Sequence, residues 1–233
     1  MNWFSSPPEP PKNDNGSFIL IILFLIIFIA NKNKKWSPRE GKSNNSLDKI
    51  IGLESVKDEI KYYMDFIKNS GKYKEWNVKL PKGILLAGPP GTGKTLLVKT
   101  LSKKLDIPLI TASGSEFIEK YVGVGAKRVR DLFAKAKGKK KCIIFIDEID
   151  AVGQRRDKSD NSERASTVNQ LLTEMDGFEE KDNVIVFAAT NLIKTLDPAL
   201  IRSGRFDKKV YFDLPNNNER EQLCELYLKD MKL

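Results

Sequence analysis

The sequence predicts an α/β fold in which a parallel sheet is flanked by helices. Three apolar runs, GILLA (83–87), CIIFID (142–147) and NVIVFAAT (183–190), suit strands that are buried on both faces. TLLVKTLSKKL (95–105) is amphipathic at helical spacing and follows the first run after a short glycine-rich segment. With 233 residues, the chain has room for one domain of about 180 residues and an N-terminal appendage.

The glycine-rich segment AGPPGTGKT (87–95) fits the phosphate-binding pattern Gly-x-x-x-x-Gly-Lys-Ser/Thr. Its glycines let successive N–H groups point at a phosphate, and the following helix adds the positive end of its dipole. Lys94 can then reach the β- and γ-phosphates, and the Thr95 hydroxyl can coordinate Mg²⁺. The sequence therefore predicts a P-loop NTPase that uses ATP and Mg²⁺. The expected nucleotide-binding residues of this loop are Gly88, Pro89, Pro90, Gly91, Thr92, Gly93, Lys94, Thr95 and Leu96.

Two acidic residues stand at the end of the second apolar run. Asp147 falls at the carboxyl end of the predicted strand, where ligands bind in open α/β sheets. This position suits a carboxylate that acts on Mg²⁺, directly or through water, while Glu148 suits a general base that polarises the attacking water. Asp150 is either a third catalytic acid or a residue that helps to cap the following turn.

The composition excludes some classes of function. The sequence has no histidine, so a zinc peptidase of the His-Glu-x-x-His type is excluded within it and no zinc is expected. The net charge is +9, but the densest basic run, KAKGKKKC (135–142), contains no aromatic residue that could stack on bases. We expect a solvated turn there and no nucleic-acid partner. Cys142 and Cys224 lack metal-ligand spacing and suit a reducing compartment.

Residues 18–30 are all apolar. A helix of thirteen residues spans only about 20 Å, so its length also allows a signal-peptide core or a buried helix. Acidic residues before it and no small-x-small cleavage site after it argue against a signal peptide. Its uniformly apolar surface argues against a core helix, and the basic residues that follow keep the C-terminal side cytoplasmic, or in a matrix or stroma. We expect a tail (1–17), one transmembrane helix (18–30) and a basic linker (31–46).

From Leu47 onward the chain resembles the AAA ATPases, most closely the ATPase module of the FtsH family of membrane-bound ATP-dependent zinc metalloproteases. The resemblance implies an AAA domain over 47–215 and the start of a truncated helical lid over 216–233, without the peptidase domain. It rests on the following segments, which occur in family order: LDKIIGLESVKDEI (47–60), FIEKYVGVGAKRVRDLF (117–133), DEIDAVGQRR (147–156), NQLLTEMDGF (169–178), AATN (188–191) and LDPALIRSGRFD (196–207).

The resemblance also implies contacts between subunits. Arg202 and Arg205 match the arginine fingers that enter a neighbouring subunit's site and stabilise charge on the transferring phosphoryl group. Such fingers require a closed ring of identical or related subunits, a hexamer by family resemblance. One of the two arginines could instead be structural, paired with Asp207 or another nearby carboxylate. Residues 176–178 match the segment through which a family subunit senses its neighbour's nucleotide.

Further site residues come from the same resemblance. Ile51 and Gly52 would lie against the adenine. Asn191, at the end of the third apolar run, would hydrogen-bond the γ-phosphate and the attacking water. The residues that match the pore loop, which grips a polypeptide substrate, are Tyr121, Val122 and Gly123.

Together these expectations describe a membrane-anchored AAA ATPase that hydrolyses ATP to unfold or translocate polypeptides in protein quality control, with no peptidase activity in this chain. Some features depart from the family pattern. Leu192 and Ile193 replace the Arg-Pro that usually follows the residue matching Asn191, and most of the lid is missing. The alternative is a poorly active nucleotide-binding subunit of a hetero-oligomeric ring, or a fragment of a split FtsH-type protease.

Overall fold

The computed structural model divides the chain into two compact units, residues 1–36 and 37–233, and the helices and strands given below belong to the second. None of the described helices is long and apolar enough to cross a membrane. The predicted transmembrane helix at 18–30 lies outside the described residues. Those residues are 36–40, 50–76, 81–119, 121, 123–154, 162–178 and 184–229.

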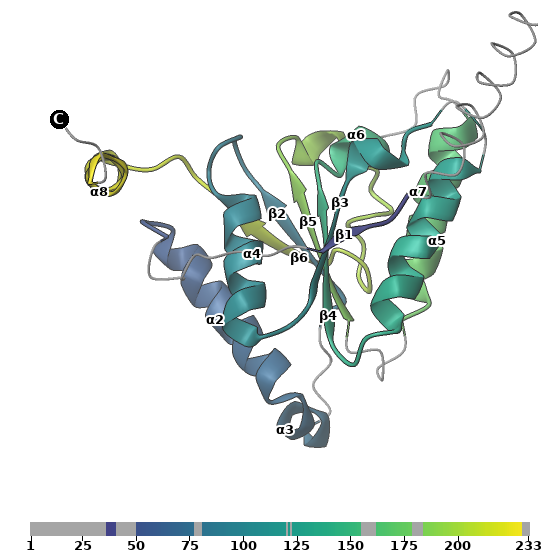
Figure 1. The fold of residues 1–233 in the computed structure, drawn as a ribbon, viewed down its shortest axis with the longest axis horizontal. Coiled ribbons are helices and arrows are strands. Elements are labelled where there is room, and N and C mark those ends of the chain that lie inside the picture. The colour runs from purple at the N-terminus through teal and green to yellow at the C-terminus, as the bar shows by residue number, and fades with distance from the viewer. Residues whose placement is uncertain are drawn as a thin grey trace, which may run out of the picture. The chain divides into compact units, whose positions relative to one another are not determined.

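One sheet forms the centre of the domain, with strand order β1-β3-β4-β5-β2-β6 (Figure 1). Strands β2 to β6 pair in parallel, whereas β1 runs antiparallel to β3. The predicted parallel sheet is therefore confirmed, and β2 and β4 have the bounds that the apolar runs indicate. The strands are β1 Arg39–Glu40, β2 Gly83–Ala87, β3 Leu109–Ser113, β4 Cys142–Asp147, β5 Val184–Thr190 and β6 Lys208–Tyr211.

Helices cover both faces of the sheet. Helices α2, α3 and α4 lie on one side and α5 and α7 on the other, while α6 lies above the strands (Figure 1). The helices are α2 Glu54–Lys68, α3 Ser70–Glu75, α4 Lys94–Leu105, α5 Val124–Lys137, α6 Asp150–Gly153, α7 Ser162–Asp176 and α8 Asn217–Leu228, with short 3₁₀ helices η2 Gly114–Phe117 and η3 Ile193–Thr195.

The central strands are buried on both faces because their side chains alternate between the two helical layers. Ile84 and Leu86 of β2 belong to one hydrophobic cluster with Leu97 of α4 and Phe187 of β5. Leu85, between them, is also fully buried but does not belong to that cluster. This period of two is the geometry of a strand, and it explains why the sequence shows continuous apolar runs rather than alternation with polar residues.

Strand β1 lies within the segment 31–46, for which the sequence predicts a linker. It pairs with the edge strand β3, and Lys135 Nζ of α5 donates a hydrogen bond of 3.0 Å to the Pro38 carbonyl. The compact unit accordingly begins at Ser37. A two-residue strand is too short to show a hydrophobic period, so nothing in the local sequence indicates it.

Helix α8 is the described part of the predicted lid. A capping box starts it, because Asn216 Oδ1 accepts from the Glu219 N–H at 2.9 Å and the Glu219 carboxylate accepts from the Asn216 N–H at 2.7 Å. No residue of α8 is buried, and Tyr227 is 71% exposed. Within the described residues, local hydrogen bonds therefore support its first turn, and the Glu219 side chain also lies against Gly52.

Helix α5 starts so close to the preceding turn that Gly125 has no room for a side chain. A Cβ added there would lie 2.2 Å from the Phe117 carbonyl oxygen and 2.4 Å from Thr167 Oγ1. We expect Gly125→Ala to lower the thermal unfolding midpoint, because overpacking costs about 1–3 kcal/mol. Gly138→Ala, at the other end of α5, is the control, since its nearest atoms are 3.7 Å away. Equal midpoints for the two variants, measured by circular dichroism, would contradict this reading of the packing.

Candidate active site

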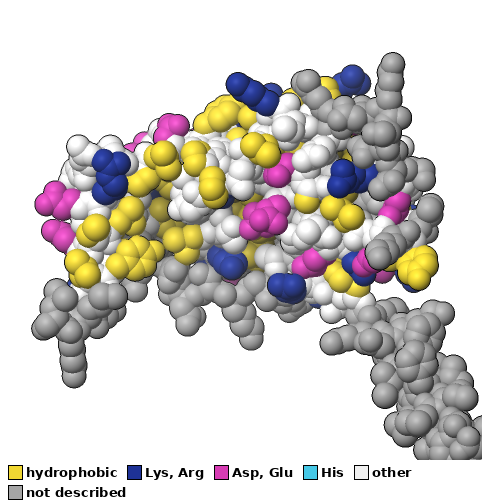
Figure 2. All heavy atoms as spheres, turned by 90° about the horizontal axis from the view of Figure 1, so that it is seen from above, with side chains coloured by type: hydrophobic (Ala, Val, Ile, Leu, Met, Phe, Trp, Pro, Cys, Tyr) yellow, Lys and Arg dark blue, Asp and Glu magenta, His cyan; other side chains and the backbone are white. Residues whose placement is uncertain are grey.

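The carboxyl ends of β4, β5 and β2 are neighbours at one edge of the sheet. The phosphate-binding loop follows β2, the acidic pair ends β4, and Asn191 follows β5. Three segments far apart in the sequence are thus brought to one place, as the sequence predicts for a ligand site in an open α/β sheet. Seen from above, the molecule shows acidic, basic and hydrophobic side chains intermixed (Figure 2).

The phosphate-binding loop leads directly into α4, whose first residue is Lys94. At one end of the loop, a Cβ on Gly88 would lie 2.2 Å from the Phe212 carbonyl oxygen, so the backbone approach requires glycine. At the other end, Gly93 takes a φ of 91° at the helix N-cap, and no described side chain caps the helix. The first N–H groups of α4 are therefore left for an anion, which the helix dipole favours.

Lys94 is buried, and its ammonium group is held by three oxygen atoms. Its Nζ donates to the carbonyls of Gly88 (2.8 Å) and Pro89 (2.7 Å) and to Asn191 Oδ1 (2.9 Å). Burial lowers the pKa of Lys94, while the charges of Asp147 and Asp150 act in the opposite direction. Phosphate oxygens would add negative charge beside the ammonium, so phosphate binding and protonation of Lys94 favour each other.

Thr95 and Asp147 provide oxygen ligands suited to Mg²⁺. Thr95 Oγ1 donates to Asp147 Oδ2 at 2.7 Å. Ligands at neighbouring corners of a Mg²⁺ octahedron lie about 3 Å apart, given metal–oxygen distances of roughly 2.1 Å. A small separation of these two oxygens would let both coordinate the ion, with phosphate oxygens and water completing the shell. The donor set therefore fits the predicted metal.

Glu148 stands in a conformation that few residues other than glycine adopt. Its φ is 50°, and its N–H donates to Asp147 Oδ1 at 3.0 Å. Its carbonyl packs closely on η2, because a Cβ on Gly114 would lie 2.3 Å from the Glu148 oxygen. Left-handed backbone at such a residue costs about 1–3 kcal/mol and persists only where the surroundings impose it. The Glu148 side chain is exposed at the sheet edge, as a base acting on water needs to be.

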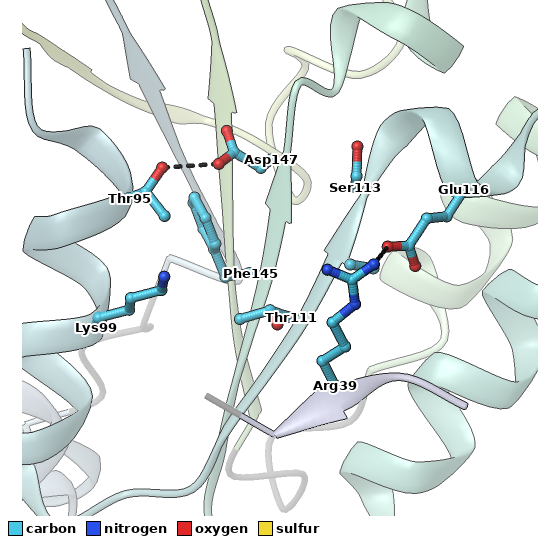
Figure 3. A pocket seen from close by; sticks show the side chains of 9 residues that line it. Arg39, Thr95, Lys99, Thr111, Ser113, Glu116, Phe145 and Asp147 are labelled. Atoms are coloured by element: carbon cyan, nitrogen blue, oxygen red, sulfur yellow. Dashed lines mark hydrogen bonds and ion pairs between the residues drawn. The ribbon is translucent and has the colours of Figure 1, made fainter. Parts of the chain in front are cut away.

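A pocket of about 180 Å³ opens beside the Thr95–Asp147 pair, between α4 and the strands β3 and β4 (Figure 3). Lys99 lines it from α4, and Arg39 of β1 lines it opposite, in an ion pair of 3.1 Å with Glu116. The sequence reasoning missed these residues. Lys99 could have been found, because it lies one helical turn beyond Thr95. Arg39 could not, because its segment showed no strand pattern.

The two predicted arginine fingers have different surroundings. Arg205 makes a bidentate pair with Asp176 of its own chain, with Nε and Nη2 at 2.9 and 2.7 Å from the carboxylate, and Nη1 donates to the Ala199 carbonyl. Arg202 is exposed, and no hydrogen bond or ion pair joins its side chain to a described residue. Asp207, suggested as a partner by the sequence, accepts from the Gly204 N–H instead. The free guanidinium is that of Arg202.

Arg205 lowers the pKa of the Asp176 carboxyl below its ordinary value of 3.8 by donating hydrogen bonds to it, with burial acting in the opposite direction. Because the folded-state pKa is lowered, the pair adds stability above that ordinary value, and the contribution is lost as the pH falls through the lowered pKa. The Asp176 side chain is 53% exposed, so solvent screening keeps the contribution small.

The other predicted residues lie around this centre. Tyr121 is 78% exposed, and Gly123, with a φ of 84°, is the N-cap of α5, whereas Val122 lies outside the described residues. Ile51 and Gly52 are half-buried before α2. In the phosphate-binding loop, Pro89 and Gly93 are half-buried, whereas Pro90 and Gly91 are exposed. Thr92 Oγ1 donates a hydrogen bond to the Pro89 carbonyl. Leu96 is partly buried and packs against the core.

Residues 84–214 match the family described as ATPase family associated with various cellular activities (AAA). The chain belongs to this family, and the class that its fold and site define is an AAA ATPase.

Its relatives are of the FtsH type, as the motifs predict. The chain is 48% identical to the ATP-dependent zinc metalloprotease FtsH of Karelsulcia muelleri (strain DMIN), over 94% of this chain and 38% of the relative. It is 45% identical to ATP-dependent zinc metalloprotease FtsH 2 of Thermoanaerobacter sp. (strain X514), over 93% and 46%. It is 49% identical to the mitochondrial inner membrane m-AAA protease component yta12 of Schizosaccharomyces pombe (strain 972 / ATCC 24843), over 78% and 24%. The chain spans less than half the length of each.

Two substitutions separate nucleotide binding from hydrolysis. Lys94→Ala removes the only described ammonium group inside the phosphate-binding loop, so we expect binding of ATP–Mg²⁺ to be lost in a titration. Glu148→Gln keeps the side chain's size without the base, so ATP should bind while turnover falls by about 10² or more. Lys103→Ala, exposed in the last turn of α4, is the control for both measurements. Equal ATP affinity in wild type and Lys94→Ala, or undiminished turnover in Glu148→Gln, would refute the respective assignment.

Proposed function

We propose that this chain is a membrane-anchored ATPase module that hydrolyses ATP to unfold or translocate polypeptides in protein quality control. The ATPase chemistry rests on two hydrogen bonds, from Lys94 Nζ to Asn191 Oδ1 at 2.9 Å and from Thr95 Oγ1 to Asp147 Oδ2 at 2.7 Å. These four residues come from three separate segments, and each has the side chain that its part in the reaction requires.

The chemistry follows from the donors and acceptors at the sheet edge. Lys94 keeps its bond to Asn191 Oδ1 and exchanges the Gly88 and Pro89 carbonyls for β- and γ-phosphate oxygens. Asn191, whose Oδ1 accepts from Lys94, is left with its amide N–H groups to donate to the γ-phosphate. Glu148 takes the proton of the attacking water. Thr95 and Asp147 would hold Mg²⁺, which would supply neutralisation of negative charge on the phosphates.

Polypeptide substrates are supported by the exposure of Tyr121 and by the relatives, whose names are those of ATP-dependent proteases and of a protease component. An aromatic side chain beside a glycine hinge can grip an extended chain without reading its sequence. Peptidase activity in this sequence of 233 residues is not part of the proposal, because it has no histidine for a His-Glu-x-x-His zinc site.

Membrane anchoring is supported by the thirteen apolar residues at 18–30 and by the basic residues that follow them. One relative is named as a component of a mitochondrial inner membrane m-AAA protease. The ATPase would then lie on the cytoplasmic side, or on the matrix or stromal side. Anchoring would also confine every copy to one plane and so favour a ring.

We expect an unfolded polypeptide to stimulate ATP turnover by the full chain, and Tyr121→Ala to remove most of that stimulation. The physical reason is loss of the aromatic contact surface, since Tyr121 is 78% exposed. Tyr62→Ala is the matched control, because Tyr62 is also exposed (54%) but lies on α2. Equal stimulation of the Tyr121 and Tyr62 variants, measured by phosphate release, would refute the substrate role of Tyr121.

A mixing experiment tests the ring. Glu148→Gln lacks the base but keeps Arg202, whereas Arg202→Ala keeps the base but lacks the arginine. If Arg202 acts across a subunit boundary, a mixture contains interfaces with both groups intact, so turnover should recover although each variant alone is slow. A mixture no faster than the average of its parts would exclude an arginine that acts in trans.

The same mixture tests the anchor. Without residues 1–35, we expect recovery only at higher protein concentration, because anchoring raises the local concentration of subunits. The same concentration dependence with and without residues 1–35 would count against a contribution of the anchor to assembly.

A further inference from the structure

Thr190, the last residue of β5, is a polar side chain inside the core. It is 1% exposed, and its hydroxyl group makes two hydrogen bonds. Oγ1 donates to Asp150 Oδ1 at 2.7 Å and accepts from the Leu192 N–H at 3.0 Å. A hydroxyl has one proton, so acceptance from Leu192 leaves that proton for Asp150. The Thr190 hydroxyl is therefore bonded to the backbone on the far side of Asn191, which lies between Thr190 and Leu192.

The backbone around Thr190 is tied to both other parts of the site. Its carbonyl accepts from the Gly88 N–H at 3.2 Å, which joins it to the phosphate-binding loop. The Ala189 carbonyl accepts from the Ile149 N–H at 3.0 Å, which joins the strand to the acidic segment. The Asp150 carboxylate adds a side-chain hydrogen bond, from the Thr190 hydroxyl, to this link between β5 and the acidic segment. The turn that carries Asn191 is therefore held from two sides, and Asp150 is its side-chain support.

The orientation of the Asn191 amide depends on this support. Its Oδ1 accepts from Lys94, so Nδ2 is the atom left for a phosphate or water. An asparagine side chain has two torsions, and the place of its amide follows closely from its backbone. A shift of the turn by even 1 Å would misdirect Nδ2, and errors of this size slow enzymes by up to about 10²-fold.

We infer that Asp150 and Thr190 are positioning residues for ATP hydrolysis. Asp150, through the Thr190 hydroxyl, holds the 190–192 turn so that the Asn191 amide faces the γ-phosphate and the attacking water. Asp150 is thereby neither a third catalytic acid nor a cap of the next turn, the two roles considered from the sequence. No side-chain cap bond is present at the start of α6. The inference rests on the role of Asn191 in the proposed function.

Thr190→Val tests the inference, because valine has nearly the shape of threonine without the hydroxyl. We expect kcat of the full chain to fall by about 10- to 100-fold, with little change in the KM for ATP. Thr190→Ser keeps the hydroxyl and should retain most of the wild-type kcat. Asp150→Asn keeps an oxygen acceptor and should do the same, whereas Asp150→Ala should resemble Thr190→Val. The Asp150→Ala/Thr190→Val double variant should be no slower than Thr190→Val alone, because the bond that Asp150→Ala removes is already lost with the Thr190 hydroxyl.

Other results would overturn the inference. A wild-type kcat for Thr190→Val, additive losses in the double variant, or a loss of ATP binding together with a lowered unfolding midpoint would each do so, the last because it marks a purely structural role. If Thr190→Val fails to fold, the kcat values of Asp150→Ala and Asp150→Asn test the inference instead. Equal values for these two variants would overturn it. Asn191→Ala separates the two proposals. If this variant hydrolyses ATP at the normal rate, the proposed role of Asn191 in hydrolysis fails. If it is slow while Thr190→Val is not, only the positioning role of Thr190 and Asp150 fails.

Discussion

The burial of one ammonium group organises the nucleotide site. Lys94 is 7% exposed, and a cation so far from water must be compensated by oxygen atoms nearby. The protein supplies three from two segments, the carbonyls of Gly88 and Pro89 and the amide of Asn191. These bonds hold the phosphate-binding loop curled and orient the Asn191 amide. A phosphate that takes the place of the two carbonyls must offer equivalent acceptors, which favours ligands that carry several anionic oxygens.

The sheet makes this arrangement possible. Loops at the carboxyl ends of parallel neighbours share one edge, so the strand order β4-β5-β2 brings Lys94 within hydrogen-bonding distance of Asn191 and Thr95 within hydrogen-bonding distance of Asp147. The pairing of β3 with β4 places η2, which follows β3, beside the acidic segment, where Gly114 packs on the Glu148 carbonyl. The exposed Tyr121 follows η2 by four residues. The Glu148 carbonyl therefore lies against the 3₁₀ helix that precedes Tyr121 in the chain.

Prediction from sequence succeeded where a signal is contiguous. The apolar runs fixed β2 and β4, and the spacing of glycines before Lys94 predicted a strand-to-helix loop, because each of these signals lies within about ten residues. The site residues that depend on distant partners were not predictable in the same way. The Thr190–Asp150 bond spans 40 residues and the Arg205–Asp176 pair spans 29. No local pattern distinguishes such a threonine from one in an ordinary strand, or an arginine finger from an arginine held by its own chain.

The short strand β1 affects the tendency of the protein to self-associate through the edge of its sheet. Strand β3 would otherwise be the open border of the sheet, with N–H and C=O groups available to any extended chain in solution. Arg39 and Glu40 occupy positions opposite Thr111 and Ile110, and Arg39 is pinned by Glu116. A strand of two charged residues is a poor template for further pairing, so the border ends in a surface that resists fibrous self-association.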